Sequence, residues 1–151
     1  MKKNILILCC GHPFASDNAF GYHVFKNLEK MKLPDNVDIM EVGFSACMIP
    51  HVIDTMDKVV IVDIFHAQKE PGTILRMKLE ELPSYIEIKK DAAKSHLIDT
   101  LDMCKLTGCC PETIFIGVVP LDSKTESEQL TPEIERKLPE VIDMILKEIN
   151  P

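Results

Sequence analysis

Polar side chains stand at the ends of two apolar runs in this chain. Asp63 closes the run Val59–Val62, and Asn18 lies in the loop that follows the run Ile5–Cys10. A carboxylate at the end of a buried strand needs a hydrogen-bonding partner, a cation or water. An amide oxygen also binds divalent cations, more weakly than a carboxylate. The loop residues His12, Asp17 and Asn18, with His23 one turn into the next helix, therefore form a candidate metal or polar-substrate set. For Asp63, the alternative is that it only accepts hydrogen bonds from loop amides.

Histidine residues extend this candidate set. His12 comes directly after the apolar run in the same loop, and His96 opens the apolar-periodic part of a predicted helix. Imidazole is the commonest metal ligand in proteins, but a lone histidine on a helix or loop is most often structural or solvated. Both roles therefore stay open for these residues. His51 and His66 lie near the carboxyl side of their own segments, where they either line a ligand crevice or are solvated loop residues.

The loop after the first apolar run shares its position with phosphate-binding loops but not their sequence. It leaves a strand and enters a helix, yet it contains neither GxGxxG nor GxxxxGK[ST]. Nucleotide binding is therefore disfavoured, and a small-molecule enzyme on a flavodoxin-like sheet is the least favoured class of protein. Within the loop, Ser16 or Asp17 is expected to cap the helix that follows.

Strand-length apolar runs alternate with segments of helical period, which predicts an α/β fold. The expected strands are Asn4–Cys9, Val37–Val42, Lys58–Ile64, Thr73–Leu79 and Thr113–Val119. The expected helices start near Asp17, His51, Asp91 and Thr131, and the last of them continues to Ile149. We predict a three-layer α/β/α sandwich, phosphorylase/hydrolase-like, with about five mostly parallel strands and Thr73–Leu79 as an antiparallel edge strand.

This sheet predicts where the candidate residues meet. In open α/β sheets, ligands bind beyond the carboxyl ends of the strands, where neighbouring connections run to opposite faces. If the first strand and Lys58–Ile64 are neighbours, the Gly11–Asn18 loop and Asp63 share one crevice.

Composition limits the class of protein. The chain has 151 residues, 46% hydrophobic and 27% charged, which suits one globular domain over residues 1–151. With 17 basic and 24 acidic residues, the net charge is −7, and the absence of a basic stripe argues against a nucleic-acid partner. No apolar run approaches the ~20 residues of a membrane helix, and no signal peptide is evident. We therefore expect a cytoplasmic protein whose 6 cysteines are thiols, most of them small buried hydrophobes.

These features, in this order, resemble the hydrogenase maturation endopeptidases, which trim the C-terminal extension from the large subunit of [NiFe] hydrogenases. The family's opening signature, an apolar strand followed by Gly-Asn and an acidic pair before a helix, corresponds to Ile5–Gly21. Val59–Asp63 resembles the family's second acidic strand end, and Glu70–Thr73 resembles its Pro-Gly turn. Ile116–Pro120 and Leu130–Pro132 resemble its last strand and helix.

The resemblance implies a trio of residues around a metal. In the family these are the second acid of the loop, the strand-end Asp and a His that opens the following helix. The first two fall on Asn18 and Asp63, and the third falls on Ala93 without a gap or on His96 with a three-residue gap. Asn18 replaces a carboxylate by an amide, while His12 replaces the usual Asn and adds an imidazole. The expected metal ligands are thus Asn18, Asp63, His96 and His12.

The function implied by the resemblance is a nickel-dependent endopeptidase acting on the precursor of a hydrogenase large subunit. Asp63, Asn18 and His96 would engage nickel already inserted in the precursor, with no nucleic acid or membrane as partner. Another divalent metal stays open for the isolated protein. The metal would polarise the scissile carbonyl or activate water. Because Asn18 removes one carboxylate, the alternative is a catalytically impaired homologue that serves as a binding or assembly factor for a hydrogenase-like subunit.

Overall fold

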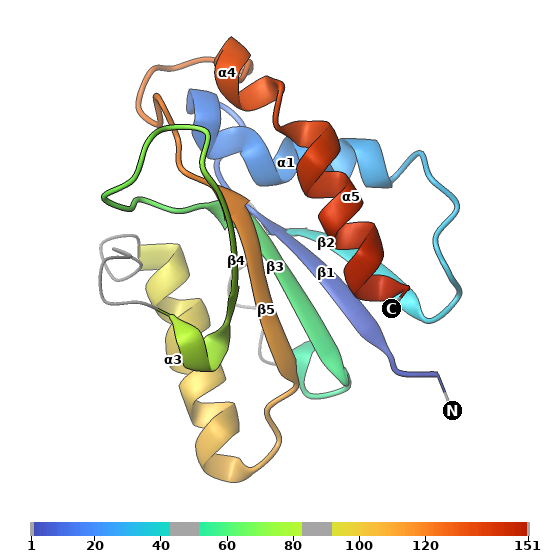
Figure 1. Ribbon diagram of the computed structural model, residues 1–151. Helices are drawn as coiled ribbons and strands as arrows, with labels where there is room; N and C mark the ends of the chain where they lie inside the picture. Colours follow the sequence, from blue (N-terminus) through green and yellow to red (C-terminus); the bar gives the residue numbers. More distant parts are fainter. Residues whose placement is uncertain (1, 43–51, 83–91, 151) are drawn as a thin grey trace.

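The computed structural model describes residues 2–42, 52–82 and 92–150, with the backbone alone for 92–98. Its elements, labelled as in Figure 1, are β1 (Ile5–Cys10), η1 (Ser16–Ala19), α1 (Phe20–Leu28), β2 (Val37–Val42), β3 (Lys58–Ile64), β4 (Ile74–Lys78), η3 (Leu79–Glu81), α3 (Ala92–Thr107), β5 (Glu112–Val118), α4 (Pro132–Glu135) and α5 (Leu138–Ile149). The helix expected near His51 falls partly outside these residues, and Val52 and Ile53 are helical.

The strands form one five-stranded sheet in the order β2-β1-β3-β5-β4. β1 pairs in parallel with β2 and β3, and β3 pairs in parallel with β5. β4 runs antiparallel to β5 at the edge of the sheet. The predicted mixed sheet is therefore confirmed, and each predicted strand agrees with the observed one to within a residue at either end.

Helices cover both faces of the sheet (Figure 1). Alternate residues of β1 supply the two cores, because successive strand side chains point to opposite faces. Ile7 and Cys9 pack in the core that includes residues of α1 and α5, whereas Leu8 and Cys10 pack in the core that includes residues of α3. Every residue of β1 and β3 is buried. The predicted three-layer α/β/α sandwich is confirmed.

The prediction of one continuous C-terminal helix from Thr131 to Ile149 is wrong. The segment forms two helices, α4 and α5, which are separated by a turn at Arg136 and Lys137. Pro139 lies in the first turn of α5. A proline ring clashes with the carbonyl four residues earlier, here that of Glu135, and proline has no N–H to donate to it. The amphipathic period continues through the break, so the pattern alone does not reveal it.

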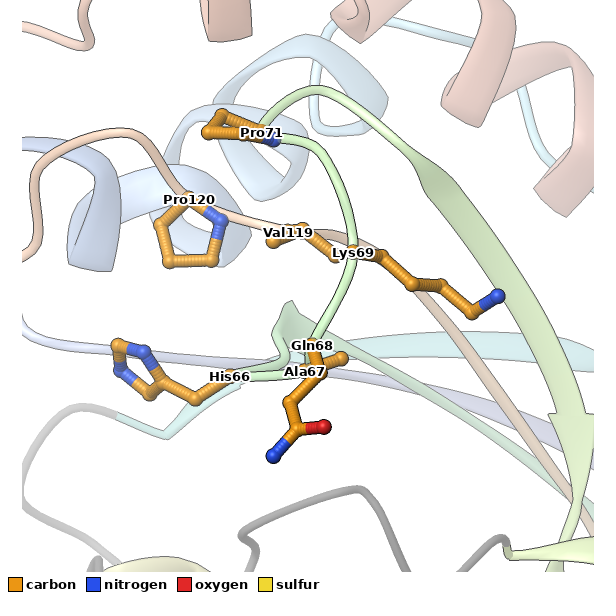
Figure 2. Close-up of a pocket in the computed structure, with 7 residues that line it drawn as sticks. All are labelled: His66, Ala67, Gln68, Lys69, Pro71, Val119 and Pro120. Carbon is orange, nitrogen blue, oxygen red and sulfur yellow. The ribbon is translucent and has the colours of Figure 1, made fainter.

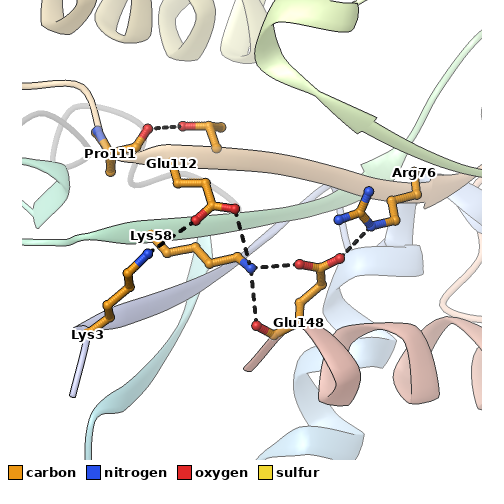
Figure 3. Close-up of polar contacts among 7 residues, drawn as sticks. Lys3, Lys58, Arg76, Pro111, Glu112 and Glu148 are labelled. Carbon is orange, nitrogen blue, oxygen red and sulfur yellow. Dashed lines mark hydrogen bonds and ion pairs between the residues drawn. The ribbon is translucent and has the colours of Figure 1, made fainter. Parts of the chain in front are cut away.

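A buried ion-pair network joins α5 to the amino ends of β3 and β5 and to β4 (Figure 3). Lys58 Nζ lies 2.7 Å from Glu148 Oε2 and 3.2 Å from the carbonyl oxygen of Glu148. Arg76 Nε donates a hydrogen bond to the other Glu148 carboxylate oxygen, and Lys58 also pairs with Glu112 at 3.7 Å. The Lys58 and Glu148 side chains are only 10% and 11% exposed. Burial raises the pKa of Glu148, but the hydrogen bonds from Arg76 and Lys58 outweigh it and hold this pKa below its usual value.

Substitution Glu148→Gln should destabilise the protein because it leaves the Lys58 ammonium buried without its closest counter-charge. We expect a loss of about 2–4 kcal/mol in the free energy of unfolding, measured by chemical denaturation. The control is Glu29→Gln, which removes an exposed pair with Lys26 on α1 and should cost no more than about 0.5 kcal/mol. Equal losses in the two variants would contradict the role given to Glu148.

The same network predicts a pH dependence of stability. Because the pKa of Glu148 is lower in the folded chain, its contribution is complete above the unfolded value near 4.5 and is lost as the pH falls through the folded value. The difference in unfolding free energy between the natural chain and Glu148→Gln should be constant near neutral pH and shrink below about pH 4.5. A difference that grows on acidification contradicts this assignment.

Candidate functional site

The candidate site lies at the carboxyl edge of the sheet, between β1 and β3. β1 leads through α1 to β2 on one side, whereas β3 leads through β4 and α3 to β5 on the other. α1 and α3 lie on opposite faces (Figure 1), so the connections diverge at this point. β1 and β3 are neighbours, so the condition for a site between their carboxyl ends is met. This is the switch point at which such sheets bind ligands.

Asp63 supplies the buried carboxylate of the site. Its side chain is 1% exposed, and its Oδ1 accepts a hydrogen bond from the N–H of Ile64 at 2.7 Å. Strand alternation places Asp63 on the same face as Val59 and Ile61, which pack in the core that includes residues of α3. Since α3 ends close to the start of β5, its first turns lie toward the carboxyl edge (Figure 1).

The third member of the predicted trio is placed only by its backbone. Ala93 and His96 both belong to the first turns of α3, on the face of the sheet toward which Asp63 points. Their side chains lie outside the described part of the chain. Which of Ala93 and His96 corresponds to the family's histidine thus stays open.

Asn18 is held against the end of β1 by a close backbone contact. Gly11 has φ +136°, and a Cβ there would lie 2.1 Å from the carbonyl oxygen of Asn18 and 3.7 Å from its Oδ1. Only glycine tolerates both the dihedral angle and this approach. η1, which contains Asn18, also contacts β3. The Asn18 loop therefore lies against the strand that carries Asp63, while a crevice shared by the two residues stays a prediction.

Asp17 has a structural role that differs from the predicted helix cap. Neither Ser16 nor Asp17 makes a side-chain cap hydrogen bond, and α1 begins after Ala19. The Asp17 carboxylate, 0% exposed, instead accepts hydrogen bonds from the N–H groups of Leu121, Asp122 and Thr131 and from the Thr131 hydroxyl, at 2.8–3.0 Å. The capping prediction is wrong because the carboxylate binds these donors and not the N–H groups of its own helix. The donors belong to a segment more than 100 residues away in sequence, which a local pattern does not reveal.

His12 lies on the exposed side of the same loop. Its Nδ1 accepts a hydrogen bond from the N–H of Phe14 at 3.2 Å, and the two rings make an edge-on contact at 6.0 Å. Among the residues that the structure describes, no three side chains of the types His, Cys, Asp and Glu gather closely enough to hold a metal. The role of His12 as a metal ligand therefore stays a prediction.

A hollow of about 300 Å³ opens beside the ends of β3 and β5 (Figure 2). His66, which the sequence left open as a lining residue, borders it together with Gln68 and Lys69 on one side and Val119 and Pro120 on the other. Sequence reasoning missed Gln68, Lys69 and Pro120. The sequence feature that could have identified these three residues is their position just beyond the carboxyl ends of two predicted strands.

The thiols of Cys9, Cys104 and Cys110 are poor nucleophiles. Burial, with Glu41 and Asp63 nearby, raises the pKa of the Cys9 thiol well above its usual range. Burial likewise raises the pKa of Cys104 and Cys110. A thiolate is the reactive form of cysteine, so these residues favour the protonated, structural role expected from the sequence.

The donors of the site suit a divalent cation. Asp63 offers carboxylate oxygens and Asn18 an amide oxygen, which are hard ligands. A metal held by Asp63 and Asn18 stays a prediction.

Comparison with known proteins identifies the family. A family model described as hydrogenase maturation protease matches residues 22–148. A putative hydrogenase maturation protease of Methanocaldococcus jannaschii is 33% identical, covering 99% of this chain and 98% of that protein. The hydrogenase 2 maturation protease of Escherichia coli is 28% identical, covering 94% of this chain and 88% of that protein.

Comparison with solved structures identifies the same family. The structure of the hydrogenase-maturating endopeptidase HybD from Escherichia coli matches with a TM-score of 0.89 and 27% identity, over 99% of this chain and 93% of that one. The chain therefore belongs to the hydrogenase maturation protease family, whose members are proteases of hydrogenase maturation. No described helix has the length and apolar character needed to cross a membrane.

Substitution Asp17→Asn should loosen the loop that carries Asn18. An amide nitrogen in place of one oxygen faces N–H donors, so buried hydrogen bonds are lost. We expect a loss of about 2–4 kcal/mol in unfolding free energy, together with faster amide exchange at Leu121 and Asp122. The control Asp122→Asn alters a partly exposed carboxylate that accepts hydrogen bonds from N–H groups of its own turn, and should cost clearly less. Unchanged exchange in Asp17→Asn would contradict the role of this carboxylate.

Proposed function

We propose that this chain is an endopeptidase that removes the C-terminal extension of a [NiFe] hydrogenase large-subunit precursor after nickel has been inserted. The observation that carries the proposal is the buried Asp63 carboxylate at the switch point, beside the loop of Asn18, in a chain of the hydrogenase maturation protease family. The relative from Escherichia coli is named for the maturation of hydrogenase 2, which supports a hydrogenase as the target here.

The chain's own groups would hold the nickel site of the precursor rather than attack the peptide. Asp63 and Asn18 present oxygen donors at one edge of the sheet, with His96 on the helix that starts at the same edge. Nickel, as part of the substrate, supplies Lewis-acid polarisation of the scissile carbonyl or of water. The raised pKa of Cys9 argues against a nucleophile on that residue. A precursor without nickel would lack the group that these donors recognise.

The hollow beyond the carboxyl ends of β3 and β5 is the place where the peptide to be cut would lie. His66 and Gln68 follow the Asp63 strand, and Pro120 follows the neighbouring β5 (Figure 2). A chain bound between them passes the carboxyl edge of β3. This position brings the peptide next to the donors without requiring movement of the sheet.

The test of this function is cleavage of purified, nickel-loaded precursor, followed by mass spectrometry. Substitution Asp63→Asn keeps the size of the side chain but removes its charge, and should lower the rate at least about 100-fold. The control Asp38→Asn removes an exposed carboxylate of β2 and should leave the rate unchanged. Failure of the natural chain to cut the nickel-loaded precursor, or equal cutting of the nickel-free form, contradicts the proposal.

Asn18 supports a second candidate function, that of a binding or assembly factor for a hydrogenase-like subunit. An amide at this position leaves the site with less negative charge than a carboxylate would. If the second function is correct, the natural chain binds the precursor without cutting it, and Asn18→Glu creates cleavage. Efficient cleavage by the natural chain that does not respond to substitution of Asn18 removes the reason for this alternative.

A further inference from the structure

Cys10 is the last residue of β1 and lies beside Asp63. The parallel register pairs Leu8 with Ile61 and Cys9 with Val62, so the next step along both strands brings Cys10 next to Asp63. Residues in register on parallel strands point to the same face of a sheet. The two side chains therefore lie side by side at the carboxyl edge, where β1 and β3 run together in Figure 1.

The two adjacent cysteines differ in environment. Cys9 is 0% exposed and packs in the core that includes residues of α1 and α5. Cys10 is 9% exposed and packs in the core that includes residues of α3, on the same face as Asp63. Both are thiols. Cys10 thus lies on the face of the candidate carboxylate, where its buried thiol donates a hydrogen bond to the carbonyl oxygen of Leu8 at 4.0 Å.

The backbone around Cys10 is held from two directions. A Cβ on Gly21 would lie 2.0 Å from the carbonyl oxygen of Cys10, so the first turn of α1 packs directly on this residue. Gly11, which follows Cys10, packs in the same way against Asn18. Cys10 is therefore next in register to Asp63 across the sheet, and it directly precedes the glycine that packs against Asn18.

We propose that Cys10 contributes a thiolate ligand to the metal that Asp63 and Asn18 engage, an inference that rests on the proposed function. Sulfur is a softer donor than carboxylate or amide oxygen and suits late transition metals such as nickel. On binding, the sulfur–metal bond forms as the S–H bond breaks, and the proton passes to solvent. The thiolate restores the negative charge that Asn18 lacks. The metal charge also offsets repulsion between the thiolate and the Asp63 carboxylate.

The experiment titrates the purified full chain with Ni²⁺ alone and with Co²⁺ alone under anaerobic conditions. The readout is the near-ultraviolet charge-transfer absorption from thiolate sulfur to metal, with affinity measured by calorimetry. Substitution Cys10→Ala should abolish the absorption and weaken binding at least about tenfold. Cys9→Ala, on the opposite face, and Cys109→Ser, an exposed thiol beyond α3, are matched controls that should retain both. Far-ultraviolet circular dichroism checks that each variant folds. If Cys10→Ala does not fold, Cys10→Ser replaces it in the titration.

A rescue variant separates loss of the ligand from damage to the core. In Cys10→Ala/Asn18→Glu, the carboxylate should restore much of the affinity while the sulfur absorption stays absent. Sulfur absorption that survives in Cys10→Ala, or that disappears in Cys9→Ala or Cys109→Ser, overturns the inference and leaves Cys10 as a core residue.

The outcome is independent of cleavage. If the natural chain cuts nickel-loaded precursor but shows no sulfur absorption with either metal, the role of Cys10 fails and the proposed function stands. If the absorption depends on Cys10 but no precursor is cut, the ligand assignment stands and the protease function fails.

Discussion

The parallel pairing of β1 with β3 is the contact on which the rest of this structure depends. Both strands are fully buried, and their register sets which residues lie together at the carboxyl edge. A shift of one residue would turn the side chains of one strand to the opposite face. Asp63 would then leave the face covered by α3, and the Asn18 loop would meet a different residue. The apolar cores on both faces resist such a shift.

Two buried charges hold the ends of this pairing. Near the carboxyl edge, Asp17 collects hydrogen bonds from residues 121–131 and so ties the Asn18 loop to the segment after β5. At the amino edge, Glu148 of α5 binds Lys58 of β3 and Arg76 of β4. Each charge has ion-pair or hydrogen-bond partners from distant parts of the chain, and these partners offset the free-energy cost of removing the charge from water. The site lies between well-anchored segments, so its donors are held before any substrate arrives.

Two neighbouring residues of one loop have different roles here: Asp17 holds the loop in place, and Asn18 belongs to the candidate site. Asp17 and Asn18 are neighbours in sequence, yet the first is completely buried and the second is partly exposed beside β1. Ser16, with φ 50°, adopts a conformation that is uncommon for a residue other than glycine, and its N–H is bonded to the carbonyl of Ser127. The loop thus takes its shape from contacts with the segment after β5. Its own helix-capping preferences have little influence.

Local pattern predicted much of the fold and part of the site. Buried parallel strands require continuous apolar runs, so the sequence specified each strand to within a residue. The break before α5 was less evident, because the amphipathic period continues across Arg136 and Lys137 and Pro139 is tolerated in a first helical turn.

The sequence by itself determined the α/β class, the strand that carries Asp63, the loop that carries Asn18, and the resemblance to a protease family. Only the tertiary structure decided that Asp17 clamps a distant segment, that Cys10 lies beside Asp63, and that Gln68, Lys69 and Pro120 border one hollow. Strand and helix formation depends on neighbours within a few residues, which the sequence displays. Register, carboxylate partners and the walls of a hollow depend on segments separated by tens of residues, and only folding brings these together.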